Sequence, residues 1–302
     1  MKTLVNWQGI RAHLDKNKMT LNWVNTIFLF SLHALFGVGI LCYVLHFGPF
    51  RGPFHWGPWG VGIILYWMAG LGITMGYHRL WSHKTFKAHW TVEIILSLLG
   101  AMAMQNSAIK WSADHRKHHA YTDSDKDPYS ASMGILWSHF LWVLFDTPRA
   151  IVSPPSLKQE FPNVLDLIQN PILRWQHRVY FIVGPVLSFL IPIGIGLLVH
   201  DFWNYLLIAG IGRILFTYHS TFFINSLAHF WGDRPHSKKN TSRDSFLCAI
   251  LALGEGYHNF HHTYPNDYRN GYRYYHFDPT KWVIKGLSWP GLTWDLKTTK
   301  LA

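Results

Sequence analysis

Three short stretches of the chain carry histidines at spacings that suit metal binding. The sequence holds 20 histidines in 302 residues, and eight of them fall in three motifs. These motifs are H-R-L-W-S-H with His78 and His83, H-R-K-H-H with His115, His118 and His119, and H-N-F-H-H with His258, His261 and His262. Positions i, i+3 and i+4 of a helix share one face, so each of the two later motifs can aim three imidazoles at one point. Imidazole binds Fe, Zn, Cu and Ni, so the motifs predict a metal site without naming the metal.

The first motif needs a different backbone from the other two. Five residues turn an ideal helix about 140° past a full turn, so His78 and His83 converge only if the helix ends or unwinds between them. Asn225 and His229 lie four residues apart and add a ninth imidazole and a carboxamide oxygen. Nine imidazoles can supply four or five ligands to each of two metal ions. The histidines in or beside apolar stretches outside these motifs are predicted not to be ligands: His33, His46, His139, His200 and His219.

The composition indicates a membrane protein. Charged residues make up 14% of the chain and hydrophobic residues 49%, with 16 Trp, 14 Tyr and 20 Phe. This balance leaves little polar surface for a water-soluble protein and suits the aromatic belts of a membrane interface. The formal charge of +11 is spread between long apolar runs. Anionic lipid, an anionic substrate carrier or an acidic redox partner therefore explains it better than nucleic acid, which is not expected as a partner.

Four apolar segments are long enough to cross a bilayer, which takes about 20 residues. They cover roughly residues 22–47, 58–77, 179–200 and 203–228 and form two hairpins. Most Lys and Arg lie in 79–178 and 229–302, so the positive-inside rule places the N-terminus, the central stretch and the C-terminus in the cytoplasm. Two shorter apolar stretches, 91–108 and 134–145, are predicted to lie on or beside the membrane. The histidine motifs then all fall on the cytoplasmic side.

The predicted fold class is an all-α integral membrane protein. Four transmembrane helices in two hairpins are capped by a cytoplasmic helical domain that holds the histidine-rich site. The fourth span, if helical throughout, is about 39 Å long at 1.5 Å per residue. A hydrocarbon core is about 30 Å thick, so the last turns, with Asn225 and His229, are expected to stand above the bilayer. Residues 1–302 are interpreted as a single domain, because nothing in the chain is typical of a linker.

At these residues the chain resembles a known family. The specific pieces are H-R-L-W-S-H followed by K-T-F-K-A, W-x-x-x-H-R-x-H-H with a downstream D-x-D-P, N-S-x-A-H-x-W-G, and G-E-G-Y-H-N-F-H-H. From about Tyr66 to the C-terminus the sequence resembles the membrane fatty-acid desaturases of the acyl-CoA (delta-9, stearoyl-CoA) type. The resemblance implies two iron ions (Fe2+), with Asn225 reaching one of them through water and no catalytic residue beyond the ligands. The implied ligands are His78, His83, His115, His118, His119, Asn225, His229, His258, His261 and His262.

The resemblance also implies the reaction. Such enzymes use O2 and two electrons to place a cis double bond, here expected at delta-9, into a long saturated fatty acyl chain. Ala113, Ser132 and Met133 stand where the animal enzymes carry Arg, so the carrier is left open among acyl-CoA, acyl-carrier protein and acyl-lipid. No H-P-G-G haem signature is present, so no fused cytochrome domain is expected. A separate electron donor of the ferredoxin or cytochrome type is expected instead. The expected location is the bacterial inner membrane or the endoplasmic reticulum.

The family resemblance places a kinked acyl tunnel beneath the irons. Gln105, Asn106, Trp111 and Thr221 are expected to shape the bend, and Tyr66 to close the methyl end, with Gly70 leaving room above it. Carboxylates near the motifs are candidates to orient the histidines from outside. The candidates are Asp114 and Glu255 foremost, and then Asp123, Asp125 and Asp127.

Two other functions fit parts of the pattern. A membrane hydroxylase or ketolase can use a similar histidine-ligated di-iron site, and only its product separates it from a desaturase. A divalent-metal transporter also uses histidine-rich segments, but it needs ionisable groups along a pathway inside the spans. The one formal charge inside a predicted span is Arg213, which would repel a metal cation.

Overall fold

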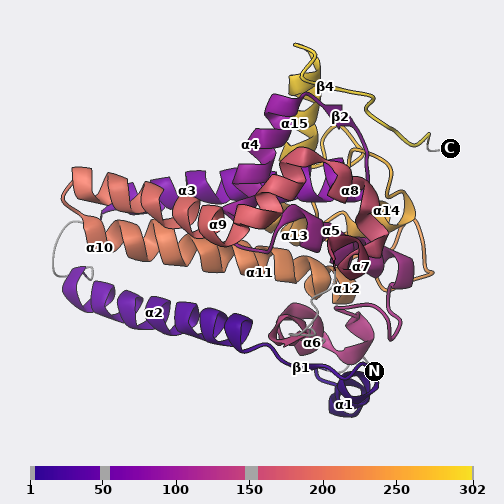
Figure 1. Ribbon diagram of the computed structural model, residues 1–302, viewed down its shortest axis with the longest axis horizontal. Coiled ribbons are helices and arrows are strands. Elements are labelled where there is room, and N and C mark those ends of the chain that lie inside the picture. Colours follow the sequence, from indigo (N-terminus) through magenta and orange to yellow (C-terminus); the bar gives the residue numbers. More distant parts are fainter. Residues whose placement is uncertain (1–3, 48–54, 147–155, 301–302) are drawn as a thin grey trace.

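The computed structural model describes residues 4–47, 55–146 and 156–300, and most of them are helical. Four long apolar helices run along the long axis of the molecule (Figure 1). They are α2 (Trp23–Phe47), α3 (Trp56–Leu71) continued by the π-helix η1 (Gly72–Ser82), α9 (Pro171–Leu198), and a fourth made of α10 (Phe202–Asn204), the π-helix η5 (Tyr205–Gly212) and α11 (Arg213–Asn225). The predicted all-α fold with two hairpins of spanning helices is confirmed.

The four helices differ in how much of their surface the protein itself covers. Only 17% of the most apolar stretch of α2 and 22% of that of α9 is buried, against 50% for the second helix and 56% for the fourth. Side chains such as Phe30, Phe181 and Leu198 project from α2 and α9 into the surroundings. A helix that is apolar all round and poorly covered by protein suits contact with lipid. The second and fourth helices therefore form the centre of the bundle.

Three of the helices differ in extent from the apolar segments predicted as spans. The second helix begins at Trp56 and runs on to Ser82, rather than covering 58–77. The third begins at Pro171 instead of 179, where the Asn170 side chain accepts hydrogen bonds from the N–H groups of the first turn. Polar residues can extend a helix beyond an apolar core, which hydropathy alone does not detect. The fourth helix is interrupted at Ser226, so Asn225 ends α11 and His229 lies in the separate helix α12 (Leu227–Phe230).

The shorter apolar stretches do not form spanning helices, as predicted. The first contains α4 (Trp90–Ala101), which packs against η1, α9 and α3 across one end of the bundle (Figure 1). The second contains α6 (Ile135–His139) and the 3-10 helix η3 (Leu141–Leu144). Both stretches pack beside the spanning helices, α4 against α3 and α9 and α6 against α11.

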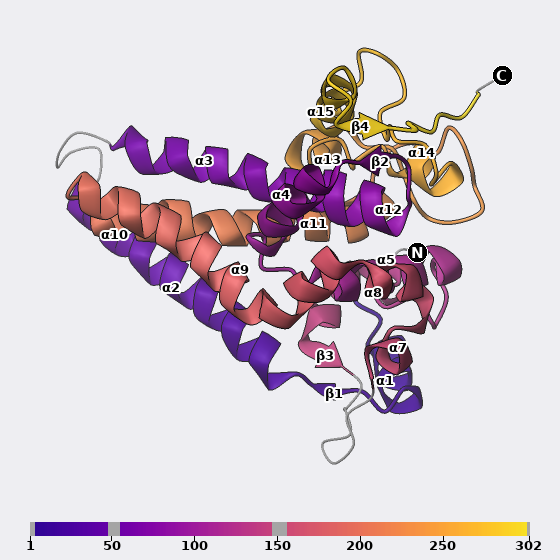
Figure 2. The same ribbon diagram turned by 45° about the horizontal axis from the view of Figure 1, so that its top comes forward.

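The cap collects short helices from distant parts of the chain at one end of the bundle, together with both ends of the described chain (Figure 2). Antiparallel two-residue strands pair β1 (Thr20–Leu21) with β3 (Phe145–Asp146) and β2 (Lys87–Ala88) with β4 (Thr293–Trp294). The helices are α1 (Trp7–Lys16), α5 (Ala108–Tyr121), η2 (Ala131–Met133), α7 (Leu157–Glu160), η4 (Pro162–Val164), α8 (Leu165–Gln169), α13 (Phe246–Leu251), α14 (His258–Thr263) and α15 (Pro279–Ser288).

The largest buried cluster ties the cap to the bundle. Ile73 and Tyr77 of η1, Leu96 of α4, Ile109 of α5 and Leu173 of α9 belong to one apolar core. Two glycines let η1 and α4 approach closely, because a Cβ on Gly72 would lie 2.2 Å from the backbone nitrogen of Gly100. This contact places the start of η1 against α4, and η1 leads into the first histidine motif.

Candidate metal centre

His78 and His83 converge because the helix that carries them changes type. In the π-helix η1 the N–H of His83 donates to the carbonyl of His78 across 3.1 Å, an i to i+5 hydrogen bond. The two rings stand 4.8 Å apart between centroids. The prediction that the pair needs a backbone other than the α-helix is confirmed. The helix does not end between the two histidines but unwinds, one of the two expected causes, because a π-helical turn takes more residues than an α-helical one; such turns are frequent at functional sites.

The two H-x-x-H-H motifs lie on helices, as their spacing predicts. His115, His118 and His119 belong to α5, which begins where the Ser107 hydroxyl accepts a hydrogen bond from the Lys110 N–H. The second motif lies on α14, whose first turn is capped by Asp244. One Asp244 carboxylate oxygen accepts the backbone N–H groups of Asn259 and Phe260 at 2.8 and 3.1 Å. Each cap satisfies N–H groups that a helix start leaves free.

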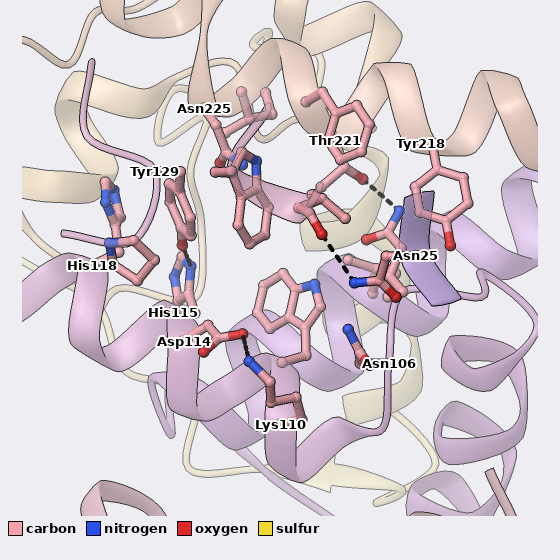
Figure 3. A pocket seen from close by; sticks show the side chains of 18 of the residues that line it. Asn25, Asn106, Lys110, Asp114, His115, His118, Tyr129, Tyr218, Thr221 and Asn225 are labelled. Atoms are coloured by element: carbon pink, nitrogen blue, oxygen red, sulfur yellow. Dashed lines mark hydrogen bonds and ion pairs between the residues drawn. The ribbon is translucent and has the colours of Figure 1, made fainter. Parts of the chain in front are cut away.

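The nine predicted histidines separate into two groups. Within each group, one ligand nitrogen from every residue lies within 4.8 Å of the others. The closest Nε2 to Nε2 distances are between 2.8 Å, for His83 and His115, and 3.2 Å, for His118 and His262. The first histidine group contains His78, His83, His115, His119 and His261; the second contains His118, His229, His258 and His262. Asn225 lines the same cavity as members of both groups, and Figure 3 shows it with His115 of the first group and His118 of the second.

The protonation state of the histidines suits metal binding. Burial, together with the neighbouring imidazoles, holds their pKa values well below the ordinary 6.5, so these rings are neutral at pH 7. This holds for His83, His115, His119, His258, His261 and His262. A metal ion binds the neutral imidazole, so no proton has to be displaced.

Groups outside the two histidine groups hold the ring nitrogens that face away from the centre. His118 Nδ1 lies 2.9 Å from Asp127 Oδ1, and His78 Nδ1 lies 2.7 Å from Glu255 Oε2. His229 Nδ1 lies 2.8 Å from the hydroxyl of Thr241. With a proton on Nδ1, the Nε2 lone pairs point inward and repel one another unless a cation lies among them. The donor set therefore fits a metal ion in each group.

The carboxylates only partly match the sequence hypothesis. Glu255 lies beside His78, as expected, and Asp123 acts through Thr241, whose hydroxyl donates to it across 2.7 Å. Asp114 was a wrong choice, because its carboxylate pairs with Lys110 Nζ at 2.6 Å (Figure 3). Asp125 pairs with the exposed Lys16 and does not touch a histidine of either group. Asp127, favoured less than Asp114, makes the direct contact.

A buried arginine that sequence reasoning missed organises the first group. Arg79 is 1% exposed and donates to Glu255 Oε1 at 2.9 Å and to Asp278 Oδ1 at 3.0 Å. Burial alone would raise the pKa of Glu255, but its contacts with His78 and with the Arg79 guanidinium outweigh burial, so the pKa is lowered. Glu255 is thus ionised and can fix the orientation of the His78 ring. The position of Arg79 between the two motif histidines was a usable signal, whereas Asp278 lies outside every motif.

One cavity of about 990 Å³ joins both histidine groups to the interior of the bundle (Figure 3). Gln105 Nε2 donates to the Thr221 hydroxyl across 2.9 Å, and the Trp111 ring stacks on His115 with centroids 4.9 Å apart. All five residues predicted to contact substrate line this cavity: Tyr66, Gln105, Asn106, Trp111 and Thr221.

The far part of the cavity differs in one detail from the expectation. The Tyr66 hydroxyl donates to the carbonyl of Leu251, and its ring lies 4.8 Å from that of Phe216. Gly70 lines the cavity, but a Cβ there would lie 2.5 Å from Leu253 Cδ1. Leu253 therefore shares the space above Tyr66 that was expected to be open.

The other histidines of the described chain lie outside both groups. His219 Nε2 lies 3.1 Å from His33 Nε2, and His219 Nδ1 lies 3.0 Å from His139 Nε2, so these three form a chain of their own. His200 lies in the turn between the third and fourth helices. The side chain of His46 is outside the described residues.

The comparisons with known proteins agree with this geometry. The family model for fatty acid desaturases matches residues 54–291, and the chain belongs to that family. It is 39% identical over 280 residues to a Schizosaccharomyces pombe protein named probable acyl-CoA desaturase, covering 92% of this chain and 55% of that protein. It is 35% identical over 289 residues to acyl-CoA desaturase 1 of Saccharomyces cerevisiae, covering 95% and 55%. It is 35% identical over 278 residues to the sn-2 palmitoyl-lipid 9-desaturase of Nostoc sp., covering 91% and 90%. The chain thus spans about half the length of the two yeast relatives.

Proposed function

We propose that the chain is a fatty-acyl desaturase that introduces a cis double bond, at delta-9, into a long saturated acyl chain. The observation that carries the proposal is the meeting of nine histidines in two groups, with members of both groups, His78 and His115 of the first and His118 and His258 of the second, lining one cavity. Relatives named acyl-CoA desaturase and palmitoyl-lipid 9-desaturase support the same reaction.

We further propose that the bound metals are two Fe2+ ions. The first histidine group would hold one ion, and the second group, with Asn225 acting through water, would hold the other. Bound iron would activate O2, which is the oxidant for the unactivated methylene C–H bond, a bond that side-chain acid and base chemistry cannot break. In the overall reaction, two substrate hydrogens, two electrons and two protons convert one O2 into two waters.

The chain's own residues position the substrate. Trp111 stacks on His115 at the histidine end of the cavity, while Gln105 and Thr221, joined by a hydrogen bond, form the wall next to it. An acyl chain lying along this wall has one pair of carbons nearest the two histidine groups. Positioning of this kind determines which C–H bonds react. Tyr66 limits the depth to which the methyl end can enter.

The carrier and the electron donor also belong to the proposal. Cavity residues near the cap carry charges of both signs: Lys110, Lys117 and Lys126 are positive, and Asp114 and Asp125 are negative. This lining does not select one carrier, so acyl-CoA, acyl-carrier protein and acyl-lipid all have to be tested. We propose a ferredoxin- or cytochrome-type donor and a cap that faces the cytoplasm.

The fatty-acid profile of a host that expresses the chain tests the proposal. Double bonds are derivatised and located by mass spectrometry, and the three carriers are then compared with purified protein and a reductant. A new cis-9 monounsaturated acid that requires O2 is expected. Hydroxy acids in place of alkenes would favour the hydroxylase reading. Metal uptake into proteoliposomes without any change in acyl chains would favour a transporter.

A further inference from the structure

A strained turn joins the helix beside the cavity to the helix that carries three histidines. α4 ends at Ala101 and α5 begins at Ala108, so residues 102–107 form the connection. Met104 and Asn106 in this turn have φ angles of 60° and 74°, in the left-handed region that non-glycine residues rarely adopt. Such conformations persist only where the surrounding structure holds them. The turn also carries Gln105 and Asn106 into the cavity wall.

A buried, charged side chain, that of Arg213, contacts this turn. It lies in the fourth spanning helix, is 3% exposed, and donates to the carbonyls of Met102 at 2.8 Å and Ser188 at 3.1 Å. In the part of the chain that the structure describes, its guanidinium contacts these carbonyls and no carboxylate. A charge held at membrane depth without an acidic partner is costly and points to a function. Met102 caps the C-terminal end of α4, where the helix dipole is negative and carbonyls lack helical partners.

Other side chains of α11 and α9 hold the rest of turn 102–107. The Tyr218 hydroxyl donates to the carbonyl of Met104, and Thr221 accepts from Gln105. From α9, the Tyr180 hydroxyl accepts the N–H of Asn106 at 2.8 Å. Figure 3 shows Tyr218 and Thr221 on one helix and Asn106 across the cavity from them. Both strained residues are therefore fixed by a tyrosine, and Arg213 fixes the point where the turn leaves α4.

We propose that Arg213 is a positioning residue that sets where along the acyl chain the double bond forms. It holds turn 102–107, and with it the cavity wall, at a fixed place relative to the histidines of α5. The inference rests on the proposed desaturase function, because its readout is the position of the double bond. A misplacement of about 1 Å can change a rate about a hundredfold, so a relaxed turn lets neighbouring carbon pairs compete.

The test compares four single variants in the full-length protein. Arg213→Met removes the charge at similar length, Arg213→Lys keeps a cation, and Tyr180→Phe removes the acceptor for Asn106 without touching any charge. Arg174→Met is the matched control, because Arg174 is an exposed cation on α9. Positional isomers of the product are quantified by mass spectrometry, and hydrogen exchange at residues 102–107 is measured in the metal-free proteins.

In Arg213→Met, the ratio of the main isomer to displaced isomers should fall at least about tenfold, equivalent to about 1.4 kcal/mol of selectivity. Exchange at the turn should rise, Arg213→Lys should recover part of the ratio, and Arg174→Met should match wild type. An unchanged isomer ratio in folded Arg213→Met overturns the inference, even if total product falls. If Arg213→Met does not accumulate, an unchanged ratio in Tyr180→Phe overturns it. Wild-type protein without desaturated product contradicts the proposed function instead.

Discussion

Replacing Asp127 with asparagine should weaken metal binding by the second histidine group while leaving the chain folded. Asp127 is wholly buried, and its Oδ1 contacts His118 Nδ1 at 2.9 Å and the Tyr129 N–H at 3.2 Å. Its Oδ2 accepts the Asp123 N–H at 3.0 Å. Asparagine has one acceptor oxygen, so in either orientation its NH2 group faces a donor. The variant cannot satisfy His118, Tyr129 and Asp123 together.

The size of the effect follows from these contacts. A hydrogen bond to a charged group contributes about 1.5–3 kcal/mol, against about 1 kcal/mol for a neutral one. Removal of a residue that orients a metal ligand typically weakens metal binding about 10- to 100-fold, which is about 1.4–2.7 kcal/mol. The two ranges agree, so a loss of affinity within one to two orders of magnitude is expected for one of the two metal ions.

A chelator competition measures this loss. Purified variants are titrated with a competing chelator, and bound iron per chain is followed by mass spectrometry of the metal. Asp125→Asn is the matched control, because Asp125 lies two residues away, is exposed and pairs with Lys16. The control should behave as wild type, while Asp127→Asn releases one metal early. Equal retention in both variants would refute the role assigned to Asp127.

Three further outcomes are expected. Tyr66→Ala should shift the relative rates toward longer acyl chains by tens of fold, since each methylene in a pocket contributes about 1–3 kcal/mol to substrate discrimination. Tyr66→Phe should keep the wild-type length profile. An unchanged profile in both variants would assign Tyr66 to packing. Burial raises the pKa of Asp244 to about 6. Between about pH 4 and 6 the folded protein therefore holds a proton that the unfolded chain lacks, so the free energy of unfolding falls as the pH rises through this range. Asp244→Asn should flatten the dependence of Tm on pH there, and an equal slope would contradict the assignment. Cysteine at Lys126 should be labelled only from the cytoplasm and at Trp203 only from the other side, and the reverse result would invert the proposed sidedness.

Local patterns were enough to predict the spans and the histidines. Apolar length marks a spanning helix, and the i, i+3, i+4 spacing in α5 and α14 places three rings on one face wherever the helix lies. The sequence did not predict which histidine belongs to which of the two groups. His118 and His119 are neighbours, yet their rings belong to different groups, because the direction of each ring depends on its tertiary partners.

The features that sequence reasoning missed depend on contacts between distant segments. The π-helical turn of η1 lies where Gly72 approaches Gly100 of α4, a contact that hydropathy does not encode. The choice between Asp114 and Asp127 depends on how the loop after α5 folds back on His118. Arg79 and its buried partners come from segments almost two hundred residues apart in sequence, so only the folded structure brings them together.

The metal content of the purified protein tests the central claim most directly. We expect two irons per chain in wild type, and one iron in a variant that combines His83→Ala with His115→Ala or in one that combines His258→Ala with His262→Ala. The variant that combines His139→Ala with His219→Ala should keep both irons, because those histidines lie outside the two groups. A single metal per wild-type chain, a metal other than iron, or loss of iron from the control variant would contradict the account.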